Sequence, residues 1–330
     1  MNNNIKICFT GYSSSSFILN DFEILKKHFI VDFNESPERK SGIISWLKFI
    51  FRTIKKVKKS NITFCWFASW YSAIVVFFSK IFRKKSIVVI GGYDVAYAPE
   101  IKYGAFTNLK EKIPAKYVLR KADLLLPVSE FTKNEILKKV KPKNFKVVNN
   151  GIITESKHVE KEKIIITIGQ VTNKNIKLKG LDTFAKVASH FPDYKFVIIG
   201  KKENSIENEL KKINKNIIFT GLIPHKDVLK WLNRSVVYCQ LSYIESFGLG
   251  VAEAMSCGCI PVVTDRGGLL EVVGDIGFIV PYGDENSTVS AIKKALKVPD
   301  NFSKNAREEI VKKFSLKIRE KKLVKIILKT

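Results

Sequence analysis

Short apolar runs alternate with longer, lysine-rich segments along most of the chain. Each short run is rich in β-branched and aromatic residues, and the segment after it repeats apolar residues at helical spacing. The strands that we predict in the first half cover residues 5–11, 29–34, 62–67, 86–91, 122–129 and 145–151. Those in the second half cover residues 163–169, 195–200, 216–221, 236–242, 259–265 and 277–281. Because strands that alternate with helices form parallel sheets covered on both faces, the pattern predicts an α/β protein.

A polar segment at residues 151–163, GIITESKHVEKEK, separates the two series of strands. Since 330 residues exceed what one core usually organises, we expect two Rossmann-like, doubly wound domains. Open sheets of this kind bind ligands at the carboxyl ends of their strands, so we expect the domains to face an interdomain cleft. We place the domains at residues 1–155 and 156–310. A C-terminal helix at 311–330 is expected to cross back to the first domain, with an apolar repeat at Ile310, Phe314, Ile318, Val324 and Ile327.

Basic residues outnumber acidic ones by 57 to 31, which gives a net charge of +26. Residues 43–59 combine six of the bases with apolar positions at helical spacing and contain no acid, so they predict a basic amphipathic helix. Two interpretations stay open: the helix lies on an anionic membrane surface, or it is an ordinary surface helix packed on the sheet. Nucleic acid would attract the same charge. No nucleic-acid-binding module is recognisable, however, and we expect no nucleic-acid partner.

Neither export nor a membrane span is predicted. The apolar run near the N-terminus is short and suits a first strand. The most apolar segment, residues 73–82, falls far short of the roughly 20 residues that a span requires. The five cysteines are odd in number and form no C-x-x-C pair, which indicates reduced thiols. We therefore expect a cytoplasmic protein, held on the inner face of the cell membrane if residues 43–59 bind there.

The stretch YIESFGLGVAEAMSCGCIP, residues 243–261, places Glu245 and Glu253 eight positions apart around two glycines. It follows a predicted strand and opens a predicted helix, so Gly248 and Gly250 lie at the start of that helix. Free backbone N–H groups and the helix dipole make such a start a site for phosphate. Carboxylates accept hydrogen bonds from pairs of sugar hydroxyls. The stretch thus predicts a site for a phosphorylated sugar or nucleotide, although a glutamate early in a helix is also good helix chemistry by itself.

These residues resemble the signature of the retaining GT-B glycosyltransferases of the glycosyltransferase 1 (group 1) family. Further similar motifs follow in order along the chain: VSEFTKNEI, VVNNGI, ITIGQVTNKNIKLKGLDTF, FVIIGK, IIFTGLIP and GGLLEVVGDIGFIVPYGD. The resemblance covers about 160 residues of the second half well and the first half loosely. It implies a GT-B fold and transfer of a sugar from a nucleotide-sugar donor.

The resemblance also implies roles for single residues. Glu253 would hold the ribose of the donor, and Glu245 would hold its sugar and diphosphate. Lys179 would neutralise the leaving diphosphate, where a fixed cation lowers the barrier, with Lys177 as a substitute. Backbone amides that would assist Glu245 belong to Phe247, Gly248 and Leu249, and the nucleobase would lie against Gly221, Leu222 and Ile223.

Three further positions bear on the donor and the acceptor. Gln170 stands where many members have an arginine that clamps the diphosphate, so Lys174 or Lys177 would have to replace it. GGYD stands where many have His-Gly-x-Asp, so Gly91 replaces the histidine, while Asp94 remains as a candidate for orienting the acceptor. Gly11 opens a serine-rich loop that would face the donor phosphates or would be a simple turn.

We therefore predict a hexosyltransferase that moves a hexose from a nucleotide-diphosphate sugar to a glycan or lipid-linked acceptor, with retention of configuration. Its pathway would be the synthesis of cell-surface polysaccharide or glycoconjugate. No cofactor and no metal is expected, because no acidic or histidine cluster has the spacing of metal ligands. The departures at Gln170 and Gly91 motivate an alternative: a non-catalytic, nucleotide-sugar-binding subunit of a membrane glycosylation complex.

Overall fold

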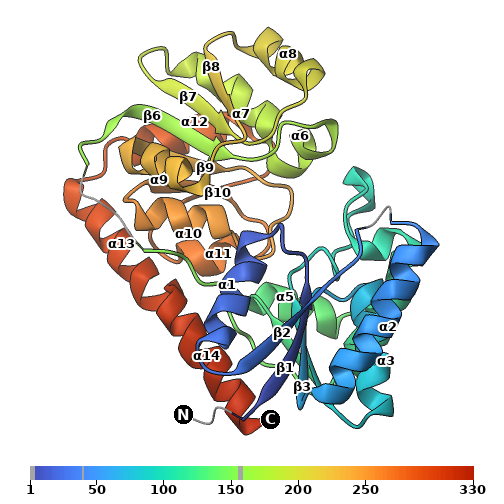
Figure 1. Ribbon diagram of the computed structural model, residues 1–330. Coiled ribbons are helices and arrows are strands. Elements are labelled where there is room, and N and C mark those ends of the chain that lie inside the picture. The colour runs from blue at the N-terminus through green and yellow to red at the C-terminus, as the bar shows by residue number, and fades with distance from the viewer. Residues whose placement is uncertain (1–3, 39–40, 155–158) are drawn as a thin grey trace. The chain divides into compact units, whose positions relative to one another are not determined.

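The computed structural model describes residues 4–38, 41–154 and 159–330 (Figure 1). Contacts divide the chain into two compact units, Met1–Gly151 with Lys317–Thr330, and Ile152–Leu316. The boundary that we expected between residues 155 and 156 lies outside the described residues. The second unit is therefore inserted, in sequence, between two segments of the first.

The first unit contains a five-stranded parallel sheet in the order β2-β1-β3-β4-β5. Its strands are β1(Lys6–Gly11), β2(Ile30–Glu35), β3(Ile62–Trp66), β4(Lys85–Ile90) and β5(Leu124–Pro127). Phe9 of β1 pairs in register with Phe33 and Phe64 of its two neighbours, and the three rings stack with centroids 5.6 and 5.3 Å apart. The chain leaves β1 toward β2 on one side and returns to β3 on the other, so the topological switch point lies between β1 and β3.

Helices cover both faces of this sheet. On one face α2(Ile43–Lys59) packs against α3(Trp70–Ile81), and α3 packs against α4(Leu109–Lys121) (Figure 1). On the other lie α1(Ser16–Lys26) and α14(Leu316–Lys329), which are joined by the buried pair Asp21–Arg319. Shorter elements complete the unit: η1(Pro99–Ile101), η2(Ala105–Thr107) and α5(Glu130–Leu137).

The strand expected at residues 145–151 is wrong. That segment makes a single parallel bridge, Leu125 to Phe145, although it continues alongside β5. Leu125 and Lys146 exchange backbone bonds with it at 3.0 and 2.9 Å, and the next bond would require an N–H from Pro127. Proline has none, so the ladder stops there.

The second unit contains a six-stranded parallel sheet in the order β11-β10-β9-β6-β7-β8. Its strands are β6(Glu162–Ile168), β7(Lys195–Ile199), β8(Ile217–Gly221), β9(Ser235–Gln240), β10(Ile260–Thr264) and β11(Phe278–Val280). β9 pairs on the opposite side of β6 from β7, so the switch point lies between β6 and β9. All six strands were predicted from the sequence, with ends that differ by one to three residues.

One face of this sheet packs on α7(Leu181–Val187), α8(Asn204–Ile213) and α12(Glu285–Ala295) in a single buried cluster. Around the other lie α9(His225–Arg234), α10(Leu249–Ser256), α11(Leu269–Val273) and α13(Asp300–Phe314). The remaining elements are α6(Asn173–Lys179) and η3(Ala188–His190). Helices on both faces of two parallel sheets make each unit a Rossmann-like domain.

The single C-terminal helix expected at 311–330 is also wrong, because the chain breaks at Ser315 between α13 and α14. Ile152 donates its N–H to the carbonyl of Phe314 and accepts from the N–H of Leu316, at 2.8 and 3.0 Å. These backbone groups therefore bond the segment that begins the second unit in place of their own helix. The break shifts the apolar repeat, so α14 buries Leu323, Ile326 and Ile327 together with Arg319.

In the described part of the chain, no helix combines the length and the apolar character needed to cross a bilayer. All five cysteines are free and buried.

Candidate functional site

The predicted site residues of the second unit lie on the loops and helix starts that follow β6, β8 and β9. These are carboxyl ends of parallel strands on either side of the β6/β9 switch point, where open α/β sheets bind ligands. Lys179 ends α6 after β6, Glu245 follows β9, and Glu253 lies in α10. The fold thus places all three at one edge of the sheet.

Lys179 and Glu245 form an ion pair. The Nζ of Lys179 donates to Oε2 of Glu245 at 2.7 Å, and the two side chains are 25% and 21% exposed. The backbone fixes this approach: the N–H of Tyr243 donates to the carbonyl of Leu178 at 2.9 Å. Gly180 ends the helix with φ +62°, and a Cβ there would lie 2.0 Å from a backbone oxygen of the loop after β9. Only glycine fits so close an approach, so the K-G pair positions the lysine.

A second contact holds the backbone of Glu245. The N–H of Gly268 donates to its carbonyl at 2.7 Å, and a Cβ at Gly267 would lie 1.9 Å from the same oxygen. The GG pair at 267–268 is therefore required for the loop before α11 to lie against the loop after β9. The carboxylate also accepts the N–H of Ser246, at 3.2 Å.

The start of α10 matches the anion site predicted from the sequence. Gly248 precedes the helix with φ +95°. Leu249 is its first residue, and N–H groups in the first turn of a helix have no partner within it. Phe247 is buried, with its ring against Phe314 at 5.3 Å, so its backbone and not its side chain is available to a ligand. A side chain at Gly250 would meet the hydroxyl of Tyr238 at 2.6 Å.

Glu253 contacts His225, a residue that the sequence analysis did not assign to the site. The Nε2 of His225 lies 2.9 Å from Oε1 of Glu253, and the carboxylate side chain is 13% exposed. This hydrogen bond raises the pKa of His225 above its ordinary value, against the opposing effect of burial. The signal in the sequence was the Pro224–His225 step directly after the expected nucleobase loop, because proline commonly precedes the first turn of a helix.

Tyr238 shows that the two carboxylates belong to one site. Its buried hydroxyl donates to Gln240 at 2.7 Å, and Gln240 donates to Ser242 at 2.6 Å. Burial raises the pKa of Tyr238 well above its ordinary value, and the negative charges of Glu245 and Glu253 raise it further. Both glutamates therefore lie near the same hydroxyl at the end of β9.

The other predicted donor-binding residues line the same edge. Gly221 has φ +72° and open space around it, Leu222 is 79% exposed, and Ile223 is partly buried. Gln170 is exposed after β6. Lys177, the substitute considered for Lys179, instead pairs with Asp182 at 2.5 Å, which raises the pKa of its ammonium group.

Asp94 and Gly11 belong to the first unit. The Asp94 carboxylate is buried and accepts backbone N–H groups from Ala68 at 2.9 Å and Gly92 at 2.7 Å. Burial raises its pKa to about 6. Gly11 ends β1, and a Cβ there would lie 2.8 Å from the Ile18 side chain, so glycine at this position is explained by the packing of α1.

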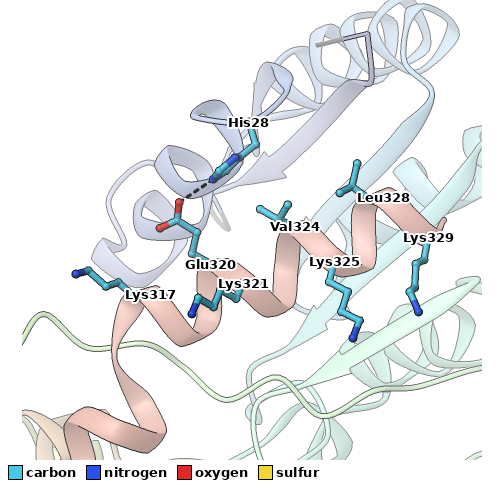
Figure 2. A pocket seen from close by; sticks show the side chains of 8 residues that line it. All are labelled: His28, Lys317, Glu320, Lys321, Val324, Lys325, Leu328 and Lys329. Carbon is cyan, nitrogen blue, oxygen red and sulfur yellow. Dashed lines mark hydrogen bonds and ion pairs between the residues drawn. The ribbon is translucent and has the colours of Figure 1, made fainter. Parts of the chain in front are cut away.

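A separate hollow of about 570 Å³ lies along α14 in the first unit. Figure 2 shows lysines following this helix, with His28 of the preceding loop bonded to Glu320 at 2.7 Å. The hollow is open and is lined by Val324 and Leu328 as well as the lysines. Among the described residues, no group of three histidine, cysteine or acidic side chains is arranged to hold a metal ion.

A family profile decides the identity. The profile described as "Glycosyl transferases group 1" matches residues 150–312, which include every site residue of the second unit. The chain belongs to this family. As a group 1 glycosyltransferase it is 28% identical over 255 residues to N-acetyl-alpha-D-glucosaminyl L-malate synthase of Bacillus anthracis, covering 70% of this chain and 64% of that protein.

A second relative of this glycosyltransferase belongs to the phosphatidylinositol N-acetylglucosaminyltransferase of Arabidopsis thaliana, of which it is one subunit. The two chains are 25% identical over 222 residues, which is 63% of this chain and 49% of that protein. The chain thus spans between about half and two thirds of the lengths of these relatives.

Solved structures establish the GT-B fold of the chain. HepE of Anabaena, crystallised in complex with UDP and glucose, superimposes with a TM-score of 0.80 at 14% identity over 99% of this chain and 100% of that one. Sucrose-phosphate synthase of Thermosynechococcus elongatus gives 0.78 at 14% identity over 99% of both chains. The fold class predicted from the sequence, two Rossmann-like domains of GT-B type, is confirmed.

Proposed function

We propose that this glycosyltransferase moves a hexose from a nucleotide-diphosphate sugar to a glycan or lipid-linked acceptor, with retention at the anomeric carbon. The observation that carries the proposal is the Lys179–Glu245 pair beside the start of α10, with Glu253 near the same tyrosine hydroxyl. A cation, two hydroxyl acceptors and a phosphate-binding helix start are the groups that a sugar diphosphate requires. The HepE crystals that contain UDP and glucose, a nucleotide and a sugar on the same fold, support this choice of donor.

In the proposed reaction the bond between the anomeric carbon and the diphosphate oxygen breaks, and its electron pair stays on the diphosphate. Lys179 and the N–H groups of Gly248 and Leu249 stabilise the charge that develops there. The acceptor hydroxyl forms the new bond on the same face, and its proton passes to the departing diphosphate oxygen. Glu245 orients the sugar, and Glu253 accepts the ribose hydroxyls. The role we assign to Asp94, orienting the acceptor, depends on the pocket described in the next subsection.

A screen of UDP-, GDP- and ADP-sugars by thermal shift tests the donor assignment, because a ligand stabilises only the protein that binds it. We expect one nucleotide to raise the melting temperature of the wild type and to lose most of this effect in Glu253→Ala. Sugar release or transfer by the isolated protein would distinguish an enzyme from the non-catalytic alternative. Unaltered donor affinity in Glu253→Ala would contradict the ribose assignment.

We also propose that α2 binds an anionic membrane surface, where a lipid-linked acceptor for cell-surface glycoconjugates would lie. One side of α2 is buried through Phe49, Thr53 and Val57. The opposite side exposes Ile43 at 78%, Leu47 at 49% and Phe51 at 71%. These three residues are four positions apart, so they form one line along the helix, which Lys55 and Lys59 continue. An apolar line followed by lysines suits insertion among acidic headgroups.

Not all bases of α2 are available to a membrane. Lys56 bonds Asp32 at 2.5 Å and the carbonyl of Phe33 at 2.7 Å, and Arg52 bonds Asn34 at 2.8 Å. Co-sedimentation with vesicles of phosphatidylglycerol should therefore fall in Ile43→Ser/Phe51→Ser and in Lys55→Gln/Lys59→Gln. Phosphatidylcholine vesicles serve as the uncharged control, and Lys80→Gln, whose lysine pairs with Asp123, as the charge-matched control. Binding that persists unchanged in both variants would leave α2 as an ordinary surface helix.

A further inference from the structure

An aromatic pocket of about 370 Å³ opens at the carboxyl edge of the first unit's sheet. It is lined by residues that follow β1, β2, β3 and β4, so it includes the β1/β3 switch point, where an open sheet binds its ligand. Six aromatic side chains contribute to the wall: Tyr12, Trp46, Phe67, Trp70, Tyr71 and Tyr93. No residue of the donor site in the second unit takes part.

The backbone of Phe67 indicates that this wall is built for a ligand. Phe67 has φ +62°, a conformation that a bulky side chain adopts only under strain. Its N–H donates to Val89 at 2.8 Å, and its carbonyl accepts the hydroxyl of Ser72 at 2.7 Å, so the strained conformation is held from both sides. The ring fills the place of a side chain at Gly91, where a Cβ would lie 2.2 Å from it. Glycine at 91 and strain at 67 together set one aromatic ring against the pocket.

The charges of the pocket are acidic in a chain of net charge +26. Asp94 and Glu111 are the acidic residues of its lining, and none of the described lining residues is lysine or arginine. Glu111 accepts the hydroxyl of Tyr93 at 2.9 Å, and Asp94 accepts two backbone N–H groups. Aromatic faces and carboxylates repel phosphate and other anions. The same groups suit a sugar, because rings pack on the apolar face of a pyranose and carboxylates accept from its hydroxyls.

We infer that this pocket binds a sugar ring without negative charge, as the ring of the acceptor to which the new residue is added. The inference rests on the proposed function for the word acceptor, whereas the binding of a sugar to the first unit does not require transfer to occur. Trp70 is the ring most open to such a ligand, since half of its surface is exposed at the mouth.

Saturation-transfer NMR on the full chain tests the inference, with methyl glycosides of glucose, galactose, N-acetylglucosamine and glucosamine as probes. Glucose 6-phosphate is the anionic comparison, and octyl glucoside reports on an apolar chain. We expect ring protons of at least one uncharged or amino glycoside to be saturated and those of the phosphate to stay silent. Trp70→Ala should weaken binding by about tenfold, the scale on which removal of a stacked ring acts.

Phe77→Ala is the matched control, because Phe77 lies on the same helix, is 50% exposed and is not part of the lining. Trp70→Phe, which keeps a ring, should restore most of the binding. Silence from every glycoside, equal binding of the phosphate, or equal loss in Phe77→Ala would overturn the inference. Saturation confined to the octyl chain would show a lipid pocket instead. A failed nucleotide screen with positive glycoside signals would overturn the donor assignment alone.

Discussion

Both glutamates of the candidate site have a basic partner in the structure. Glu245 pairs with Lys179, and Glu253 pairs with His225. Sugar hydroxyls that approach these carboxylates must share them with, or displace, the existing partner. The pairs therefore make donor binding sensitive to substitutions and to pH.

Lys179→Ala should lower kcat by about 100-fold, because one preorganised donor to a developing anion has this order of effect. Donor affinity should fall much less, since the leaving-group charge grows only as the bond breaks. Lys177→Ala is the control, since its ammonium group pairs with Asp182 on the exposed side of α6. Initial-rate kinetics and donor titration measure the two quantities, and an equal loss in both would argue against selective leaving-group stabilisation.

His225→Asn should change how stability depends on pH. The pKa of His225 is raised in the folded protein, so its pair with Glu253 stabilises fully below the unfolded pKa of about 6.5 and is lost as pH rises through the folded value. The melting temperature of the wild type should exceed that of the variant most at low pH. Donor affinity of the wild type should rise over the same interval, because neutral His225 competes less for Glu253. Melting curves and donor titrations across the interval check both trends, and parallel curves for the two proteins would contradict them.

Sequence reasoning found the acidic residues and the lysine of this site but not the histidine. The spacing of Glu245 and Glu253 around a helix start is local, so it is visible in one stretch of sequence. His225 reaches Glu253 across 28 positions, through the return of α9 and β9, and no periodicity encodes that return.

At the scale of elements, the end of β4 illustrates how one glycine fixes a wall. Gly91→Ala should destabilise the protein by roughly 1–3 kcal/mol, the usual cost of overpacking, because its Cβ would enter the Phe67 ring. The double variant Gly91→Ala/Phe67→Gly should recover much of this loss, since glycine also relieves the positive φ at 67. Denaturant unfolding followed by tryptophan fluorescence measures both.

Gly42→Ala provides the control for this pair, since nothing lies within 4 Å of a Cβ there and its φ is −71°. A Gly91→Ala variant as stable as Gly42→Ala would show that the Phe67 ring moves aside without cost.

The elements themselves were predictable where burial and period agree. All strands of the second unit and helix 43–59 follow from apolar patterns. The two failures share a cause, since at Pro127 and Ser315 a backbone bond decides the outcome. Pro127 withholds an N–H from the segment beside β5, and Ile152 takes the bonds that would have joined α13 to α14. Pattern analysis weighs side chains, so it does not register which distant carbonyl a given N–H meets.

At the scale of the whole molecule, Arg319 attaches the last segment of the chain to the first unit. It forms a two-point pair with Asp21, at 2.5 and 2.6 Å, and donates to the carbonyls of Val148 and Asn149. Asp21 also accepts from the indole of Trp66 at 3.0 Å. Both charged side chains are almost fully buried.

Arg319→Met should destabilise the first unit by about 3–5 kcal/mol, because it leaves the Asp21 carboxylate buried without its counter-charge. Asp21→Leu/Arg319→Met should restore part of this, as no lone charge then remains. Fluorescence of Trp66, which lies against the pair, should report the transition. Lys313→Met, whose lysine pairs with Glu309 on the surface of α13, should be nearly neutral. A double variant no more stable than Arg319→Met would show that the lost hydrogen bonds matter more than the lone charge.

The arrangement of the units along the chain has a consequence for biosynthesis. Asp21 and Arg319 are separated by 298 positions, so at about 5–20 residues per second the ribosome delivers the guanidinium roughly 15–60 s after the carboxylate. Throughout that interval the nascent first unit has an acid in its interior and no arginine to neutralise it. The inserted second unit, whose segments are contiguous, emerges entire before then. The half of the protein that is translated first is thus the half that matures last.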